Sequence, residues 1–111
     1  MTIHELSDRY NIEIKKLNYF ADHHLIKTGK PYNDDDEKRL SIICTLYSVG
    51  LNADTIKRFL LLAKENNQAE QIKLLNKHRA NLLEDVHTKQ KLLDQVDYMI
   101  YEIKNKGGGA K

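Results

Sequence analysis

The stretch I-E-I-K-K-L-N-Y-F-A-D-H-H-L-I, residues 12–26, decides how the first half of the chain is interpreted. Its apolar side chains recur at Ile14, Leu17, Phe20 and Ala21, which is the spacing of an amphipathic helix. The stretch therefore predicts a helix with a polar face that is either solvated or available to bind a partner. The residues expected on that face are Lys15, Lys16, Asn18, Tyr19 and Asp22.

A second short helix is predicted directly before this stretch. Thr2 and Glu5 have the Thr-x-x-Glu spacing of a capping box, in which the two residues bind each other's backbone amides. The helix that they open is expected to end near Tyr10, with Asn11 in the turn and Glu13 near the start of the next helix. Two short helices joined by a turn of about three residues form the helix-turn-helix pattern.

Two further helices are predicted after the stretch. The segment K-T-G-K-P at residues 27–31 interrupts the helical pattern. Asn33 is placed to cap a third helix with Asp34–Asp36 in its first turn, where the helix dipole favours anions. Gly50 is placed to end that helix and Asn52 to cap a fourth. The predicted inward residues are Leu40, Ile43, Cys44, Tyr47, Ile56, Phe59, Leu60 and Ala63, with Ile42 and Leu46 on the flank.

The last third of the chain contains a heptad repeat. After a polar joint at residues 64–69, apolar residues recur at two positions of each heptad, a and d, as in a coiled coil. A helix from residue 72 to residue 103 would be roughly 48 Å long, which is too long to be buried on a small four-helix domain, so pairing with a second copy is expected. Arg79 and Lys89 interrupt this seam. The a positions are Ile72, Arg79, Val86, Leu93 and Ile100, and the d positions are Leu75, Leu82, Lys89, Val96 and Ile103.

Composition and charge exclude several classes of protein. The 111 residues allow one modest domain and an extended element. A content of 41% hydrophobic and 31% charged residues fits a helical protein rather than a disordered chain. The single cysteine, Cys44, cannot form an internal disulfide, and no stretch has the pattern of a signal peptide or a membrane span. We therefore expect a soluble cytoplasmic protein.

No spacing typical of a catalytic or metal site is found. His23 and His24 are adjacent and cannot chelate one ion together on a helix, and the pair Glu84 and His87 lacks further ligands within the chain. The acidic run at residues 34–37 is interpreted as a helix start rather than a magnesium site. We expect neither enzymatic activity nor a cofactor nor a metal ion.

The order of these elements resembles that of MerR-type transcriptional regulators, which begin with a winged helix-turn-helix and end in a dimerising helix. The family's opening Ile-Gly-Glu-Leu-Ala is similar to I-H-E-L-S at residues 3–7. Its signature Val-Ser-x-x-Thr-Leu-Arg-Tyr-Tyr-Glu-x-x-Gly-Leu-Leu is similar to residues 12–26. Its Tyr-Ser, acids and Arg-Leu are similar to Y-N-D-D-D-E-K-R-L at residues 32–40, and its Leu-Gly-Phe-Ser-Leu-Glu-Glu-Ile-Lys to V-G-L-N-A-D-T-I-K at residues 49–57.

The resemblance covers about residues 2–104 and, with the patterns above, implies an all-α fold. We expect a winged helix-turn-helix-like DNA-binding domain with a minimal wing at residues 1–66. A coiled-coil dimerisation helix is expected at residues 67–106 and a disordered tail at residues 107–111. The chain differs from the family pattern at three places. Asn18 replaces the arginine of Arg-Tyr-Tyr, the wing is shortened to K-T-G-K-P, and His24 replaces a glycine, from which we expect a different exit from the second helix.

The resemblance also implies that the second helix enters the major groove of double-stranded DNA. Lysine donates to guanine and asparagine pairs with adenine in that groove. We therefore expect base or phosphate contacts from Lys15, Lys16 and Asn18, and a phosphate contact from Tyr19. Each of them would otherwise be a solvated side chain. Further phosphate contacts are expected from Thr2, Lys27, Lys30, Tyr32, Lys57 and Arg58.

Two functions remain open from the sequence. The first is a homodimer, antiparallel by the resemblance, that acts on the nucleoid as a sequence-specific regulator of transcription and recognises a pseudo-palindromic site. The second is an architectural or protein-interaction dimer that binds DNA non-specifically or binds a protein partner instead. The ordered helix-turn-helix pattern and the long heptad helix favour the first function, which is the one we expect. The short wing and Asn18 motivate the second function as the alternative.

Overall fold

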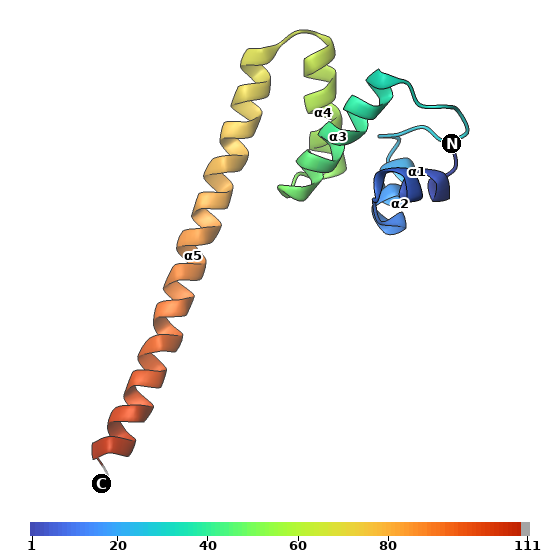
Figure 1. Cartoon of the computed structure of the whole chain (residues 1–111). Coiled ribbons are helices and arrows are strands. Elements are labelled where there is room, and N and C mark those ends of the chain that lie inside the picture. The colour runs from blue at the N-terminus through green and yellow to red at the C-terminus, as the bar shows by residue number, and fades with distance from the viewer. Residues whose placement is uncertain (110–111) are drawn as a thin grey trace. The chain divides into compact units, whose positions relative to one another are not determined.

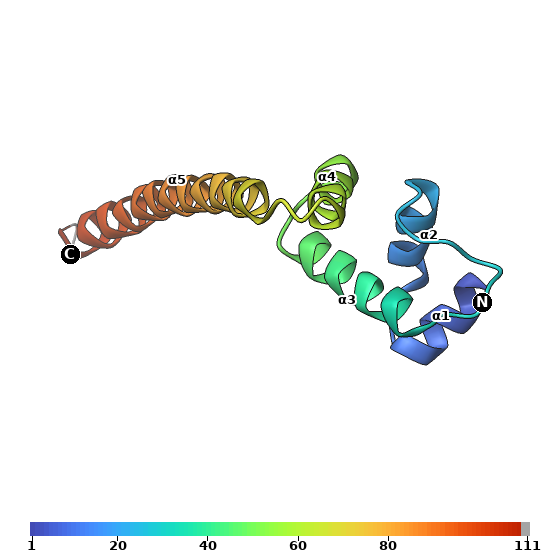
Figure 2. The same cartoon turned by 90° about the horizontal axis from the view of Figure 1, so that it is seen from above.

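The structure is a computed structural model that describes residues 1–109. Within these residues the chain forms five α-helices and no strand (Figures 1 and 2). Residue contacts separate the segment Met1–Gln71 from the residues that follow it. The all-α fold expected from the sequence is confirmed. The helices are α1 (Ile3–Tyr10), α2 (Ile14–Asp22), α3 (Asp34–Ser48), α4 (Ala53–Lys64) and α5 (Gln68–Gly109).

The core of the N-terminal unit is built from one face of each of α1 to α4. α1 packs against α2, and α3 packs against α4. The rings of Phe20 and Tyr47 meet edge to face, with centroids 5.4 Å apart, and connect α2 to α3. Each fully buried Leu, Ile or Phe side chain contributes about 1.5–3 kcal/mol relative to an exposed one. The largest fully buried side chains are Phe20, Leu6, Leu17, Leu25, Ile43 and Ile56.

The predicted inward faces agree with the structure except at helix ends and flanks. The prediction is wrong for Ile14 and Ala63, which are exposed. Leu46, predicted on a flank, is buried, and so is Leu62 beside Ala63. A turn of α4 that buries leucine instead of alanine removes more apolar area from water. The predicted inward residues found buried are Leu40, Ile43 and Ile56, and those found half-buried are Cys44, Tyr47, Phe59 and Leu60.

Polar side chains cap the first turns of α1, α3 and α4. Thr2 Oγ1 accepts from the Glu5 amide at 3.1 Å, but the Glu5 carboxylate accepts from the Thr2 hydroxyl at 3.3 Å instead of from its amide. The reciprocal capping box occurs in α3, where Asn33 Oδ1 accepts from the Asp36 amide at 2.8 Å. Asp36 Oδ2 in turn accepts from the Asn33 amide at 3.1 Å. Asn52 caps α4 as predicted.

Left-handed residues follow the ends of the first four helices. At the end of α2, the His24 amide donates to the Ala21 carbonyl at 3.0 Å and the Leu25 amide to the Phe20 carbonyl at 2.8 Å. This is the Schellman pattern of helix termination. His24 has φ +59°, the conformation that glycine favours, so replacing glycine does not by itself require the different exit that we expected. The left-handed residues are Asn11, His24, Gly50 and Asn66.

α5 is one continuous helix of 42 residues (Figure 2). Its predicted apolar seam is exposed, from 38% at Leu75 to 68% at Ile103. Arg79 and Lys89, which interrupt the seam, are exposed as well. The helix continues through Gly109, beyond the predicted end at residue 106, and residues 110 and 111 of the predicted tail lie outside the described residues.

Candidate nucleic-acid interface

The turn between α1 and α2 is fixed by the last turn of α1. Asn11 adopts a left-handed conformation with φ +54°. Ser7 Oγ donates to the Ile12 carbonyl at 2.7 Å, and the Ile12 amide donates to the Ser7 carbonyl at 3.3 Å. Leu6 on α1 and Leu17 on α2 are both fully buried. The two helices therefore form a rigid helix-turn-helix unit that orients α2.

The outer face of α2 carries three exposed polar side chains. Lys15, Asn18 and Asp22 lie on one side of the helix and are all exposed. Leu17 and Phe20 on the other side have no exposed area. Lys15 and Asn18 are predicted contact residues, whereas Asp22 is predicted on the polar face without a contact to DNA. Together they present a cation, an amide and a carboxylate, which is a mixed set of hydrogen-bond donors and acceptors.

Two other predicted contact residues of α2 have partners inside the chain. The Lys16 Nζ lies 3.8 Å from a Glu13 carboxylate oxygen. The Tyr19 hydroxyl accepts from the Ala53 amide at 3.2 Å, and its ring lies 5.3 Å from that of Tyr47. Tyr19 therefore connects α2 to α3 and α4. This is a structural role that the sequence did not indicate, because Ala53 lies far away in the chain.

The shortened wing after α2 is held against the N-terminal segment. The Gly29 amide donates to the Met1 carbonyl at 2.7 Å, and the Met1 amino group donates to the Lys30 carbonyl at 2.5 Å. Gly29 has φ +83°, a backbone conformation that is unfavourable for residues with a side chain. Although it forms no strand, the segment thus has backbone bonds that fix its path.

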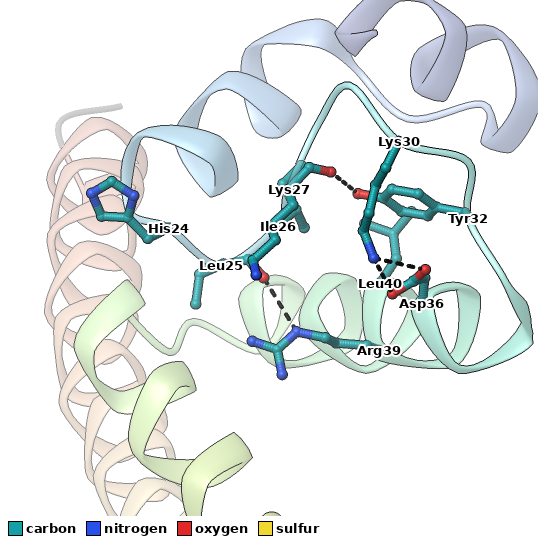
Figure 3. A pocket seen from close by; sticks show the side chains of 9 residues that line it. All are labelled: His24, Leu25, Ile26, Lys27, Lys30, Tyr32, Asp36, Arg39 and Leu40. Atoms are coloured by element: carbon teal, nitrogen blue, oxygen red, sulfur yellow. Dashed lines mark hydrogen bonds and ion pairs between the residues drawn. The ribbon is translucent and has the colours of Figure 1, made fainter. Parts of the chain in front are cut away.

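The side chains of Lys30 and Tyr32 also hold the wing in place (Figure 3). Lys30 Nζ lies 3.1 Å from both carboxylate oxygens of Asp36, and the Tyr32 hydroxyl donates to the Lys27 carbonyl at 2.6 Å. Two of the three predicted phosphate contacts here, Lys30 and Tyr32, therefore already help to hold the wing. The side chain of Lys27 is exposed.

Arg39 on α3 is a candidate that the sequence reasoning missed. Its Nε donates to the Leu25 carbonyl at 3.4 Å, and Figure 3 shows the guanidinium directed away from Asp36. With Lys27 it lines a hollow of about 290 Å³ behind the wing. It also lines a second hollow, together with Lys57 and Lys64 of α4. Folding thus gathers cations that are far apart in the sequence, which no local spacing could indicate.

The remaining two predicted contacts, Thr2 and Arg58, are exposed. Both hydrogen-bonding functions of the Thr2 hydroxyl are engaged with Glu5. Arg58 lies on α4 outside the residues that line the two hollows.

Comparison with known families identifies this arrangement. The family model described as "MerR HTH family regulatory protein" matches residues 1–62, more than half of the 111 residues. The chain belongs to this family. No curated protein and no solved structure matches the chain. The family assignment makes the helix-turn-helix of this MerR-family protein a DNA-binding domain of a transcription regulator.

The pKa shifts of Asp36 and Tyr32 in this MerR-family protein favour the charge states that their hydrogen bonds at the wing require. The bond from the Asn33 amide lowers the pKa of Asp36 below 3.8, and Lys30 lowers it further. Burial raises the pKa of Tyr32 above 10.0, and the negative charge of Asp36 adds to this effect. The carboxylate is therefore charged and the phenol is a neutral donor at physiological pH. Burial likewise raises the pKa of the Cys44 thiol, so little reactive thiolate is present.

Among the described residues, no cluster of three or more His, Cys, Asp or Glu side chains is arranged to hold a metal ion. None of the described helices combines the length and the apolar character needed to cross a bilayer.

Proposed function

We propose that this MerR-family protein is a dimeric, sequence-specific DNA-binding regulator of transcription that inserts α2 into the major groove. The observation that carries the proposal is the outer face of α2. Lys15, Asn18 and Asp22 are exposed there, opposite the fully buried Leu17 and Phe20. Lysine donates to guanine, asparagine pairs with adenine, and aspartate accepts from the cytosine amino group. These three side chains are the proposed base contacts.

Cations around α2 would supply the contacts to phosphate. Lys27, Arg39 and Lys57 are exposed and line hollows at the wing and at α3–α4. Contacts to phosphate position a protein on DNA but carry no sequence information directly. We assign affinity to these residues and sequence preference to the outer face of α2. Thr2, Lys16, Tyr19, Lys30, Tyr32 and Arg58 remain proposed secondary contacts.

The exposed seam of α5 supports a homodimer. An apolar stripe on a long helix is stabilised when it pairs with a second helix. Two helix-turn-helix units in a two-fold dimer recognise half-sites that are separated by whole helical turns of DNA. We therefore expect a pseudo-palindromic target and association with the nucleoid.

Selection of bound duplexes from a random pool at physiological salt would test this function. The wild-type dimer, verified by sedimentation, should enrich one pseudo-palindromic motif. The double variant Lys15→Ala and Asn18→Ala should lose about tenfold or more in affinity for that motif, because each good base contact contributes about 1–3 kcal/mol. Affinity for random DNA should change less. The matched control Lys77→Ala and Asn81→Ala, on the outer side of α5, should bind the motif as the wild type does.

A second function is favoured by the pairing of cations near α2. Lys16 and Lys30 each face a carboxylate, that of Glu13 or Asp36, and Asp22 adds negative charge to the outer face. Such a surface has a weaker attraction for phosphate. An architectural dimer would bind all duplexes equally, whereas a protein-interaction dimer would bind none. Either result in the selection would replace the first proposal.

A further inference from the structure

Two cations lie within the apolar seam of α5, and their partners can be inferred. Arg79 occupies an a position and Lys89 a d position, and both are exposed. Among the described side chains no ion pair involves either of them. A charge that pairing would desolvate needs an opposite charge nearby. In the proposed dimer, on which this inference rests, the second copy must supply those charges.

A parallel, in-register pair places each cation against its own copy. In that arrangement a positions face a positions and d positions face d positions. Arg79 would meet Arg79, and Lys89 would meet Lys89. Like charges facing each other across a seam are repulsive, which disfavours the parallel dimer.

In an antiparallel pair, the a positions of one helix face the d positions of the other. Several registers satisfy this pairing, and each differs from the next by a shift of one heptad. In one of these registers every seam residue faces a seam residue of the second copy. The dimer is then symmetric about a point between His87 and Thr88. In this register Ile72 faces Ile103, Leu75 faces Ile100, Arg79 faces Val96, Leu82 faces Leu93, and Val86 faces Lys89.

In this register an acid lines the hole that receives each cation. In antiparallel packing, the side chain at an a position enters a hole formed by four residues of the partner, at positions a, d, e and the next a. The side chain at a d position enters a hole formed by the partner's residues at positions d, g, a and the next d. The hole for Arg79 includes Asp97 at e. The hole for Lys89 includes Asp85 at g, and Lys89 of the second copy completes that hole at the next d position, so Asp85 lies next to both lysines. Both acids are exposed on α5 in the single chain and carry the charge that the cations need.

The neighbouring antiparallel registers lack this match. A shift of one heptad in one direction places Lys89 of the second copy in the hole for Arg79. A shift in the other direction places Lys104 there. In both shifts Arg79 meets a lysine, and the holes for Arg79 and Lys89 contain no acid. The first shift leaves Ile100 and Ile103, and the second leaves Ile72 and Leu75, without a facing seam residue within the heptad repeat.

We propose that Asp85 and Asp97 select a single antiparallel register of the α5 dimer by pairing with Lys89 and Arg79, respectively, of the second copy. The partner that fits this face is thus a second copy of the same helix, recognised by charge as well as by its apolar residues.

Mixing two charge variants tests the pairing between copies. The Asp85→Lys chain and the Lys89→Glu chain each form homodimers with like charges opposed, whereas their heterodimer restores both contacts. Random pairing would make about half of all dimers mixed, and charge-guided pairing should raise the ratio of heterodimer to homodimer about tenfold or more. Native mass spectrometry after subunit exchange measures this ratio. The control pair Glu84→Lys and Lys91→Glu, at outward f positions, should mix randomly.

Heterodimer preference excludes a contact within one chain. Asp85 and Lys89 are four residues apart on one helix face, so they could also interact in the same copy. That interaction is equally broken in the heterodimer and in the homodimers. Random mixing of the two variants would therefore overturn the proposal.

Disulfide cross-linking locates the register while all four charges are kept. In a Cys44→Ser background, mixing Leu82→Cys with Leu93→Cys should give a cross-linked dimer, because these residues face each other in the proposed register. Cross-linking of Leu82→Cys with Val86→Cys, or with Ile100→Cys, would indicate a shifted register and overturn the proposal. A wild type that is dimeric and selects a DNA motif but cross-links in a shifted register refutes only the register. A wild type that is monomeric by sedimentation refutes both the register and the dimeric function.

Discussion

The hydroxyl oxygen of Tyr19 on α2 accepts a hydrogen bond from the amide of Ala53, the first residue of α4, at 3.2 Å. Amides in the first turn of a helix have no acceptor within the helix. Without Tyr19, the amide of the buried residue Ala53 would therefore lack a hydrogen-bond acceptor. The bond also fixes the helix that we propose as the DNA reader against the second half of the domain.

Tyr19→Phe should lower the free energy of unfolding by about 1 kcal/mol, because the Ala53 amide loses its acceptor while the aromatic contacts remain. Urea unfolding at fixed protein concentration measures the change. Tyr98→Phe on α5, a residue that is 61% exposed, is the matched control and should leave stability unchanged. Equal stability of the two variants would show that the Tyr19 bond contributes nothing.

His24→Gly should stabilise the protein by about 0.5–1 kcal/mol. A left-handed conformation costs a side-chain-bearing residue about 1–2 kcal/mol, and the greater freedom of glycine in the unfolded chain offsets part of the gain. Asn66→Gly makes the same change at φ +57°, but asparagine tolerates this conformation, so its gain should be smaller. Thermal unfolding of both variants would compare them, and destabilisation by His24→Gly would contradict the prediction.

Asn33→Ala should destabilise the protein by about 1 kcal/mol, the usual effect of removing an N-cap side chain. The Asp36 amide would lose its acceptor at the start of α3. Asn81→Ala, in the middle of α5, removes an asparagine with no capping role and should not destabilise. Urea titrations of the two variants would separate a specific capping effect from a general loss of asparagine.

Acid should weaken the fold partly through Asp36. Because the pKa of Asp36 is lower in the folded chain than its ordinary value of 3.8, this carboxylate contributes stability above that pH. The contribution is lost as the pH falls through the folded pKa. Asp36→Asn should therefore flatten the decline of unfolding free energy at acidic pH, and Lys30→Gln should flatten it less. If the unfolding free energy of Asp36→Asn declines with acid as steeply as that of the wild type, this role of Asp36 is excluded.

Lys27→Ala should reduce the salt dependence of DNA binding. Each phosphate that a cation neutralises adds about 0.9 to the slope of log affinity against log salt concentration on duplex DNA. Removal of Lys27 should therefore lower the magnitude of that slope by about 1, measured by fluorescence anisotropy over a range of salt concentrations. Lys73→Ala on α5 is the control. A slope equal to the wild type would remove Lys27 from the proposed interface.

The local part of the fold was predictable because its signals are local. The capping residues Asn33 and Asn52, the glycine that ends α3 and the apolar spacing of α2 act within one or two helical turns. The heptad seam also depends only on positions along one helix. Burial at Ile14 and Ala63 was mispredicted because the neighbours that cover or expose a helix end come from elsewhere in the chain.

The sequence by itself determined the helices, their order and the polar face of α2, because each depends on residues within a few positions of one another. Tertiary structure alone decided which polar side chains are engaged within the chain and which are available to bind a partner. Tyr19 is engaged by α4, Lys30 is held by Asp36, and Arg39 joins the cations of the wing and of α4. The physical reason is that hydrogen bonds and charges act over a few ångströms in space, whatever the separation along the chain.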